Sequence, residues 1–291
     1  MVLSAAAFVL SLSVAAAGPK RIDIQTADGL RYALVDAIEG PARPTVVVLH
    51  GATIGAEATE KSSGFREAAL KHGYSVVFPE GVGKVWNDGR SFRAGANDVA
   101  FLKILAGKLA ADGIADPKRL YIAGVSNGGM MTFRMLCDAP DAFAGAGAVI
   151  SALGAEIGGA CKPTRRMSLA MVSGASDPIV PYKGGRVGFF GGRGAVWGAE
   201  QTAEFFALAN GCGARKETVE KDGESADTSV TRIDWACDPR LAVTLFRVEN
   251  GGHQSYGGAP LPQIMFGRTT AAFSAPEAIL DHFDAAAGQR K

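Results

Sequence analysis

Residues 119–129 read RLYIAGVSNGG and predict a strand, a sharp turn and the beginning of a helix. The apolar run at 119–123 is short and leads straight into a glycine, which is typical of a buried strand that ends in a turn. Gly124 and Gly128 lie two residues before and after Ser126. A side chain at either flanking position would collide with neighbouring backbone at such a turn, so glycines are required and the serine hydroxyl projects beyond the sheet. Ser126 is therefore the candidate nucleophile.

Strand and helix patterns alternate along the chain around this turn. The alternation indicates a parallel sheet covered by helices on both faces. Residues 22–26 and 31–35 flank the turn residues Ala27-Asp28-Gly29 and predict an antiparallel hairpin before it. The expected fold is α/β, with a mostly parallel, doubly wound sheet and an N-terminal antiparallel hairpin. The expected strands are 45–49, 74–78, 119–123, 143–150, 167–172 and 241–248, and the expected helices are 58–71, 97–111, 199–210 and 276–287.

A serine hydroxyl needs a base within hydrogen-bond reach to attack at neutral pH, and that base is most often histidine. The chain has four histidines. His50 belongs to a His-Gly pair at a strand end, His72 lies at a helix end where it can cap carbonyls, and His282 falls in the C-terminal helix. His253 follows strand 241–248 in a glycine-rich loop, at the edge of the sheet where the nucleophile is expected. His253 is therefore the candidate general base.

The third group of such a relay is a carboxylate that orients the imidazole and stabilises its protonated form. Asp177 lies between the other two residues in sequence and follows strand 167–172, in a loop stiffened by two prolines. Asp234 is the alternative, but residues 233–235 look like the interior of a strand. Asp177 is the candidate acid.

The oxyanion that forms when a serine attacks a carbonyl needs two backbone N–H donors. One normally follows the nucleophile, and the other comes from the loop after the third strand. Asn127 and Ala52 occupy these places, and Thr53 is the alternative to Ala52. No phosphate-binding loop competes with this interpretation, because residues 83–85 lack the pattern of a Walker motif. The sequence indicates no metal site.

Four motifs together resemble the extracellular polyhydroxybutyrate depolymerase and feruloyl esterase family of α/β-hydrolases. They are His-Gly at 50–51, Ser-Asn-Gly-Gly-Met at 126–130, Asp-Pro-Ile-Val-Pro-Tyr at 177–182 and Gly-Gly-His at 251–253. The resemblance covers nearly the whole chain after residue 17. It implies a cofactor-free esterase in which Ser126, Asp177 and His253 have the roles given above. The aromatic residues Trp86, Tyr182 and Tyr256 are the expected substrate contacts.

Two positions depart from the family pattern. Many relatives have Thr-Trp-Pro after the histidine, whereas this chain has Gln254-Ser255-Tyr256, so the aromatic wall of the acyl site is expected to differ. Relatives often have cysteine after His-Gly, whereas this chain has Ala52, which removes a side chain and keeps the backbone donor. The ester chemistry is expected to survive both changes.

The composition limits the classes of partner. The 291 residues carry a formal net charge of +1 and no basic tract, so neither nucleic acid nor an anionic membrane is an expected partner. No repeat or Pro/Ser/Thr linker interrupts the sequence, and residues 18–291 are expected to form a single catalytic domain. Residues 81–96 and 183–198 are glycine-rich with isolated aromatics, and they are expected to be loops over the site or mobile surface loops.

Residues 1–17 are apolar, too short to span a bilayer and end in small residues, which resembles a signal peptide cleaved after Ala17. A buried N-terminal helix is the alternative. An exported protein, extracellular or periplasmic and without a membrane anchor, is expected. Its four cysteines include no Cys-x-x-Cys pair, and their even number suggests two disulfides. Three pairings, or buried free thiols, are open, and the favoured pairing closes the shortest loops: Cys137–Cys161 and Cys212–Cys237.

The leading hypothesis is hydrolysis of carboxylic esters through an acyl-serine. Hydroxycinnamoyl esters of plant polysaccharide or short 3-hydroxyalkanoate oligomers are the expected small-molecule or oligomeric substrates. Crystalline polymer is disfavoured, because no tethered binding module is visible. A serine peptidase of the same fold is the second hypothesis, since the triad chemistry does not separate amides from esters. A catalytically inactive hydrolase fold that binds a ligand is the third.

Overall fold

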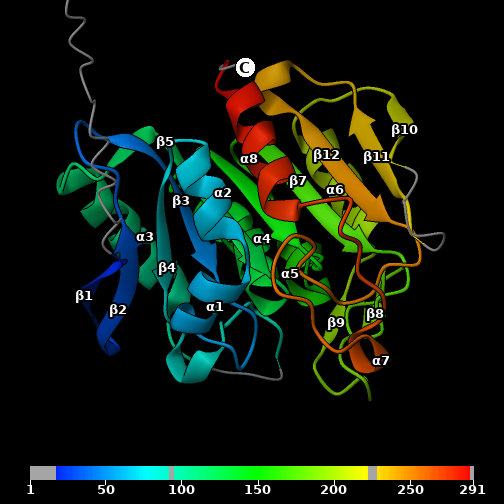
Figure 1. Ribbon diagram of the computed structural model, residues 1–291, viewed down its shortest axis with the longest axis horizontal. Coiled ribbons are helices and arrows are strands. Elements are labelled where there is room, and N and C mark those ends of the chain that lie inside the picture. Colours follow the sequence, from blue (N-terminus) through cyan, green and yellow to red (C-terminus); the bar gives the residue numbers. More distant parts are fainter. Residues whose placement is uncertain (1–17, 92–94, 222–227, 289–291) are drawn as a thin grey trace, which may run out of the picture.

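The structure is a computed structural model that describes residues 18–91, 95–221 and 228–288, so the expected signal peptide lies outside the described residues (Figure 1). Its centre is a ten-stranded sheet with strand order β1-β2-β4-β3-β5-β6-β7-β12-β11-β10. A separate two-stranded hairpin pairs β8 with β9. The strands are β1 (Lys20–Thr26), β2 (Gly29–Asp36), β3 (Arg43–Leu49), β4 (Ser75–Pro79), β5 (Ala115–Val125), β6 (Gly145–Val149), β7 (Ser168–Gly174), β8 (Gly185–Arg186), β9 (Ala195–Val196), β10 (Arg215–Lys221), β11 (Val230–Trp235) and β12 (Val243–Val248).

The middle of the large sheet is parallel and both of its ends are antiparallel. Strands β4, β3, β5, β6, β7 and β12 run in the same direction. The N-terminal hairpin of β1 and β2 is attached antiparallel to β4, and β11 and β10 add antiparallel strands at the other end. The expected α/β class, the mostly parallel doubly wound sheet and the N-terminal hairpin are confirmed. Strand β10 was not predicted, because its sequence, RKETVEK, is charged at most positions.

The helices cover both faces of the sheet. One expected helix, 58–71, is in fact two, because Gly64 has a left-handed φ of 77° and ends the first helix. A Cβ on Gly64 would lie 2.5 Å from the carbonyl oxygen of Gly257, so only glycine fits at this position. The helices are α1 (Ala56–Ser62), α2 (Phe65–Lys71), α3 (Asp98–Ala111), α4 (Asn127–Asp138), α5 (Ala155–Ala160), α6 (Ala199–Ala209), α7 (Gln263–Phe266) and α8 (Ala275–Ala286), with 3₁₀ turns η1 (Val82–Lys84) and η2 (Pro239–Leu241).

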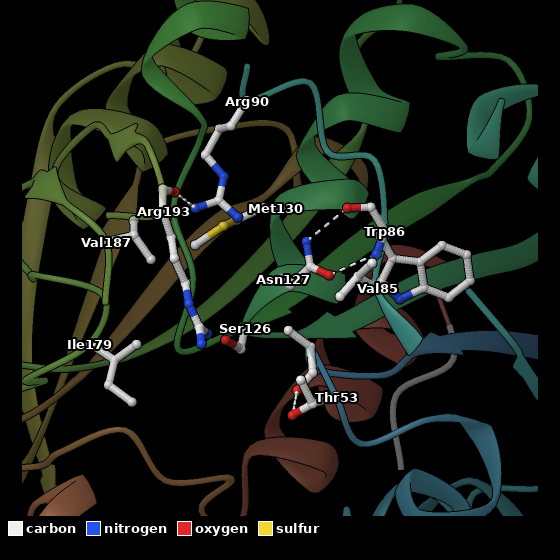
Figure 2. Close-up of a pocket in the computed structure, with 11 residues that line it drawn as sticks. Thr53, Val85, Trp86, Arg90, Ser126, Asn127, Met130, Ile179, Val187 and Arg193 are labelled. Carbon is white, nitrogen blue, oxygen red and sulfur yellow. Dashed lines mark hydrogen bonds between the residues drawn. The ribbon is translucent and has the colours of Figure 1, made fainter. Parts of the chain in front are cut away.

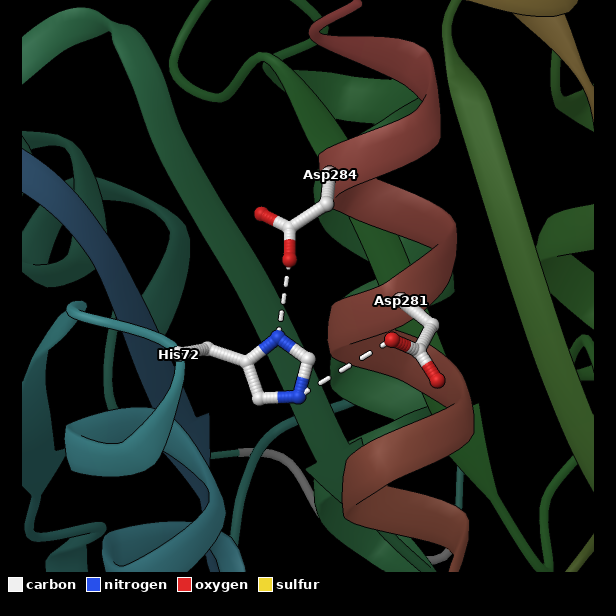
Figure 3. Close-up of side chains that lie close together, drawn as sticks. All are labelled: His72, Asp281 and Asp284. Atoms are coloured by element: carbon white, nitrogen blue, oxygen red, sulfur yellow. Dashed lines mark hydrogen bonds and ion pairs between the residues drawn. The ribbon is translucent and has the colours of Figure 1, made fainter. Parts of the chain in front are cut away.

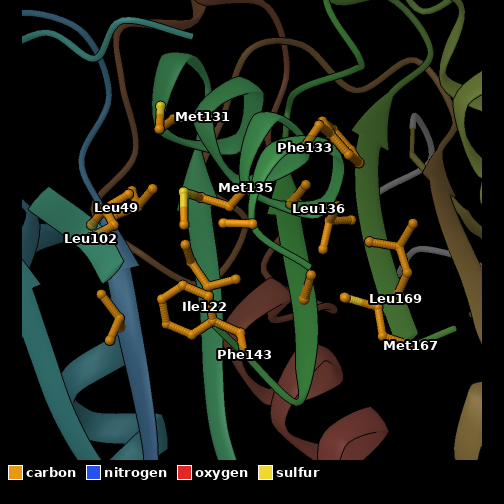
Figure 4. Packing of buried hydrophobic residues seen from close by; sticks show 14 of the residues in the cluster. Leu49, Leu102, Ile122, Met131, Phe133, Met135, Leu136, Phe143, Met167 and Leu169 are labelled. Atoms are coloured by element: carbon orange, nitrogen blue, oxygen red, sulfur yellow. The ribbon is translucent and has the colours of Figure 1, made fainter. Parts of the chain in front are cut away.

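Each face of the sheet has its own hydrophobic core. Val47 and Leu49 of β3 face the core beneath α3, α4 and α6, whereas Val46 and Val48 face the core beneath α1, α2 and α8. Figure 4 shows the first of these cores, in which side chains of α3 and α4 pack on the sheet. Because successive residues of β3 are buried on opposite faces, the strand needs the continuous apolar run that its sequence has.

Two disulfides tie helices of one face to the adjoining loops. Cys137 in α4 pairs with Cys161 just after α5, and Cys212 just after α6 pairs with Cys237. These are the pairings that close the shortest loops, with sequence separations of 24 and 25 residues. Within the described part of the chain, no helix is long and apolar enough to cross a membrane.

Candidate active site

Four parallel strands bring the candidate residues to one edge of the sheet. Strands β3, β5, β7 and β12 run in the same direction, so their carboxyl ends meet at that edge. The segment that contains Ala52 follows β3, Ser126 follows β5, Asp177 follows β7 and His253 follows β12. Residues that are up to 201 positions apart in sequence are thereby placed in one region.

Ser126 occupies the tight turn between β5 and α4. Its backbone has φ 55° and ψ −117°, a strained conformation for a residue other than glycine. A Cβ on Gly124 would lie 2.3 Å from the backbone of Gly128, and a Cβ on Gly128 would lie 2.3 Å from the carbonyl oxygen of Leu49. The Gly-x-Ser-x-Gly pattern is thus required by close backbone approach on both sides of the serine.

Ser126, His253 and Asp177 form a continuous chain of hydrogen bonds. The Oγ of Ser126 lies 3.0 Å from Nε2 of His253, and Nδ1 of His253 lies 2.7 Å from Oδ2 of Asp177. The imidazole and the carboxylate are buried, whereas Ser126 is half-buried and lines both neighbouring cavities. A neutral imidazole that donates from Nδ1 to the carboxylate has a free lone pair on Nε2 that can accept the serine proton.

Backbone contacts hold Asp177 in place for this interaction. Its second oxygen, Oδ1, accepts hydrogen bonds from the N–H groups of Ile179 and Val180, at 2.7 and 2.8 Å. The preceding turn is tied to the histidine loop, since the N–H of Ser176 donates to the carbonyl of Gly251. Asp234, the alternative acid, lies in β11 and accepts from Arg232 and Thr244. It makes no contact with the imidazole.

The loop that carries His253 is fixed by its neighbours on either side. A Cβ on Gly252 would lie 2.1 Å from the carbonyl oxygen of Phe266, so the close crossing of the two segments needs glycine. The fully buried side chain of Gln254 bonds the carbonyls of Leu261 and Gly267 and accepts from the N–H of Leu261. The histidine is therefore held at the top of β12 by the segment 254–267.

The loop after β3 contains both candidates for the second oxyanion donor, the backbone N–H groups of Ala52 and Thr53. The N–H of Thr53 donates to the carbonyl of Lys84 at 2.7 Å and so points away from the serine. Ala52 and Asn127 both line the smaller cavity beside Ser126. Asn127 is the first residue of α4, where backbone N–H groups have no partner within the helix and the helix dipole favours negative charge.

The side chain of Asn127 is locked by a buried polar network. Its Oδ1 accepts from the N–H of Trp86 at 2.8 Å, and its Nδ2 donates to Oδ2 of Asp88 at 2.6 Å. Asp88 in turn pairs with Arg90, and both residues are 3% exposed, so the charges compensate each other in the interior. The network connects the start of α4 to the loop at 81–91.

Two cavities meet at Ser126. The smaller, of about 50 Å³, adjoins Asn127 and Ala52 and is drawn in Figure 2. The larger, of about 750 Å³, contains His253 on one side and a mainly apolar wall on the other. Other residues that line one or both cavities, none of them predicted from the sequence to contact substrate, include Ile179, Val187, Phe189, Phe190, Arg193, Leu261 and Phe266.

Of the three aromatic residues expected to contact substrate, one lines a cavity at Ser126 and two do not. Trp86 lines the small cavity, but it is 1% exposed, and its indole N–H donates to the carbonyl of His50. The structure does not bring Tyr182 and Tyr256 to either cavity at Ser126. The hydroxyl of Tyr182 bonds Glu200, and the buried hydroxyl of Tyr256 bonds the carbonyl of Gly252. The signal for the actual wall was the glycine-rich segment 183–198, expected as a loop over the site.

Two further histidines, His50 and His282, are buried and bond neighbouring groups of the fold. His50 is completely buried, burial lowers its pKa, and its Nε2 accepts from the N–H of Gly81. The neutral ring thereby fixes the loop that leads to Trp86. His282 is buried in α8 against the hydroxyl of Ser168, and burial lowers its pKa to about 4.

His72 does not cap helix carbonyls with its side chain, as its position at a helix end had suggested. Its Nδ1 lies 2.8 Å from Asp284, its Nε2 lies 3.0 Å from Glu277, and Asp281 is 4.0 Å away (Figure 3). His72, Asp281 and Asp284 could offer ligand atoms to a metal, but His72 is already engaged on both nitrogens. His72 precedes β4, at the amino end of the parallel strands, opposite the edge where Ser126 lies, and the two aspartates reach it from α8.

Comparisons with known proteins identify the family. The sequence model of the prolyl oligopeptidase family matches residues 64–153. NocK of Nocardia uniformis subsp. tsuyamanensis, named as an esterase, is 30% identical over 257 residues, which are 82% of this chain and 73% of NocK. Feruloyl esterase B of Piromyces equi is 30% identical over 225 residues, 75% of this chain and 40% of that protein, so the chain spans less than half of that relative.

A solved structure agrees on the fold. The acetyl xylan esterase from Aspergillus awamori superposes with a TM-score of 0.55 at 14% identity, over 83% of this chain and 95% of that one. At that identity the likeness concerns the fold alone, whereas the match to NocK extends over most of both chains. The chain therefore belongs to this esterase family of the α/β-hydrolases and is by homology a carboxylic ester hydrolase.

Proposed function

We propose that Ser126, His253 and Asp177 are a catalytic triad that hydrolyses carboxylic esters through an acyl-serine. The observation that carries the proposal is the pair of hydrogen bonds on the two nitrogens of His253, at 3.0 and 2.7 Å. His253 takes the proton of Ser126 as its oxygen attacks the carbonyl carbon, and Asp177 stabilises the imidazolium. The imidazolium then protonates the departing alcohol, and a water molecule activated by the same base hydrolyses the acyl-serine.

The backbone N–H groups of Asn127 and Ala52 are the proposed oxyanion donors. The N–H of Thr53, the alternative donor, is already bonded to the carbonyl of Lys84, and Asn127 is the first residue of α4. Donors held in a partly enclosed site stabilise the charge that develops on the carbonyl oxygen without reorganising during the reaction. The buried contacts of the Asn127 side chain fix the start of the helix for this role.

The two cavities divide the ester into its acyl and alcohol parts. The leaving oxygen must come within reach of His253, which lines only the larger cavity. The alcohol part therefore occupies the cavity of about 750 Å³, and the acyl part occupies the cavity of about 50 Å³ beside Asn127 and Ala52. A space of this size holds only a few water molecules, so short acyl groups are favoured over bulky ones.

The substrate class that fits best is a short-acyl ester with an apolar or amphiphilic alcohol part, and short 3-hydroxyalkanoate oligomers belong to it. Hydroxycinnamoyl esters need room for an aromatic acyl group, which only the larger cavity could supply. That cavity is lined by Phe189, Phe190 and Phe266.

We also propose that residues 1–17 direct export and that residues 18–291 form one catalytic domain. The two disulfides support an oxidising compartment, extracellular or periplasmic.

A serine peptidase remains the second candidate, because the matched family model is that of prolyl oligopeptidases. A matched pair of 4-nitrophenyl acetate and acetyl 4-nitroanilide compares ester with amide on one acyl group. Methyl ferulate, acetylated xylan and 3-hydroxybutyrate oligomers complete the panel. Turnover of the esters, lost by a factor of about 10³ or more in Ser126→Ala, supports the proposal. Full activity in Ser126→Ala, or no turnover of any ester by the wild type, overturns it.

A further inference from the structure

We propose that Arg193 is a specificity-determining residue that selects esters with a carboxylate close to the scissile bond. The inference rests on the proposed function, because it concerns the same site. Arg193 lies in the β8–β9 hairpin and lines both the small and the large cavity. Figure 2 shows its guanidinium pointing into the site toward Ser126. A cation at this junction lies within reach of groups on either side of the ester.

Within the described residues, the charge of Arg193 has no counter-charge. Among the ion pairs and side-chain hydrogen bonds of the described residues, none involves its guanidinium. The described residues that line the two cavities include Arg90, Arg193 and His253, but no Asp or Glu. Arg90 is neutralised by Asp88. Among its described residues, the site therefore presents one uncompensated positive charge, which favours an anionic group on the substrate.

The hairpin holds Arg193 at its backbone. The guanidinium of Arg90 donates from Nη1 to the carbonyl of Arg193 at 2.5 Å, and the N–H of Arg193 donates to the carbonyl of Val187 at 3.1 Å. The stem of the side chain packs on Gly188, where a Cβ would lie 3.4 Å from Cδ of Arg193. These contacts restrict where the guanidinium can reach.

This anchoring is continuous with the proposed oxyanion site. Asn127 bonds Asp88, Asp88 pairs with Arg90, and Arg90 holds the carbonyl of Arg193. The residue that carries the cation is therefore positioned relative to the reacting carbonyl by two buried contacts and one partly buried contact. An arginine binds a planar carboxylate through two parallel N–H groups, which adds orientation to charge.

Two matched substrate pairs test the inference. Mono-4-nitrophenyl glutarate and 4-nitrophenyl pentanoate differ in a carboxylate on the acyl side, and 3-acetoxybutyrate and 3-acetoxybutyramide differ in one on the alcohol side. The readout is the ratio of kcat/KM for the anionic ester to that for its neutral partner. We expect Arg193→Gln to lower this ratio about tenfold in at least one pair, which also identifies the side that carries the carboxylate.

Three controls separate the outcomes. Lys183 is an exposed positive charge at the base of the same hairpin and lines neither cavity. Lys183→Gln should therefore leave the ratio of kcat/KM values unchanged. Arg193→Lys should retain part of the preference, and added salt should reduce it in the wild type. An unchanged ratio in Arg193→Gln for both pairs, or an equal loss on both members of each pair, overturns the inference and leaves the esterase proposal standing. Absence of ester turnover by the wild type would instead overturn the proposed function itself.

Discussion

The side-chain amide of Asn127 donates a 2.6 Å hydrogen bond to the buried carboxylate of Asp88, which links the residue after Ser126 to a charge pair in the interior. The link runs across 39 residues of sequence and joins α4 to the loop at 81–91. Because Asp88 also pairs with Arg90, the same carboxylate supports two structures: the start of the helix and the hairpin that carries Arg193.

Replacement of Asp88 by alanine should destabilise the protein and impair the site. The change removes the carboxylate from a buried guanidinium, which typically costs about 3–5 kcal/mol. Urea unfolding measures this loss, and kcat for a 4-nitrophenyl ester should fall with it. Asp116→Ala removes a partly exposed pair with Arg119 and should cost less than about 1 kcal/mol. Equal effects of the two substitutions would show that the buried network has no special importance.

The glycine after the serine should tolerate no side chain. In Gly128→Ala the new Cβ would lie 2.3 Å from the carbonyl oxygen of Leu49, so either the turn between β5 and α4 or strand β3 must shift. We expect a loss of about 1–3 kcal/mol and a larger fall in kcat than in stability. Gly107→Ala is the matched control, since that helical glycine has open space around it and alanine should stabilise by about 0.5–1 kcal/mol. A fully active Gly128→Ala enzyme would contradict the close packing described for the turn.

Stability should decline on acidification because of His282. Its folded-state pKa is lowered to about 4 by burial, with Arg232 acting in the same direction, whereas the unfolded value is about 6.5. Between these values the unfolded chain binds a proton that the folded protein does not, so the free energy of unfolding falls as pH decreases from 6.5 to 4. The full effect is about 3 kcal/mol. Unfolding titrations at pH 7 and 4.5 should show a smaller difference in His282→Gln than in the wild type, and an identical difference would refute this assignment.

Gln254 should act on catalysis through the loop that holds His253. Its buried amide makes three hydrogen bonds, to Leu261 and Gly267, and Gln254→Ala leaves these backbone groups without partners. We expect a loss of about 2–3 kcal/mol in stability and a reduction in kcat with little change in KM. Gln263→Ala, at an exposed position in the same segment, should alter neither. A selective rise in KM would instead indicate that Gln254 contacts substrate.

The parts of the structure that sequence predicts best are those whose cause is local. Ser126 with its two glycines, and the apolar run of β3, specify turn and strand through the residues themselves. The break at Gly64 could not be foreseen, because its reason is the approach of Gly257 from 193 residues away. Strand β10 is charged because it lies at the sheet edge, where solvent and β11 surround it.

The same distinction between local and long-range causes applies to the candidate active site. Asp177 and His253 could be chosen because each follows a strand whose end lies at the common edge. The place of Tyr256 could not be foreseen, since nothing local indicates that its hydroxyl turns inward to the carbonyl of Gly252. Arg193 gave no signal, because its place depends on Arg90 and on the β8–β9 pairing. Substrate contacts on loops therefore require the tertiary structure, whereas the reacting groups at strand ends largely do not.

The central claim is that Ser126 is the nucleophile, and covalent labelling tests it directly. The protein is treated with a 4-nitrophenyl alkylphosphonate, digested and analysed by mass spectrometry. We predict one adduct per chain, on the peptide that contains Ser126, formed at a rate that falls in His253→Gln and abolished in Ser126→Ala. An adduct on another serine, or labelling that persists in Ser126→Ala, would contradict the account.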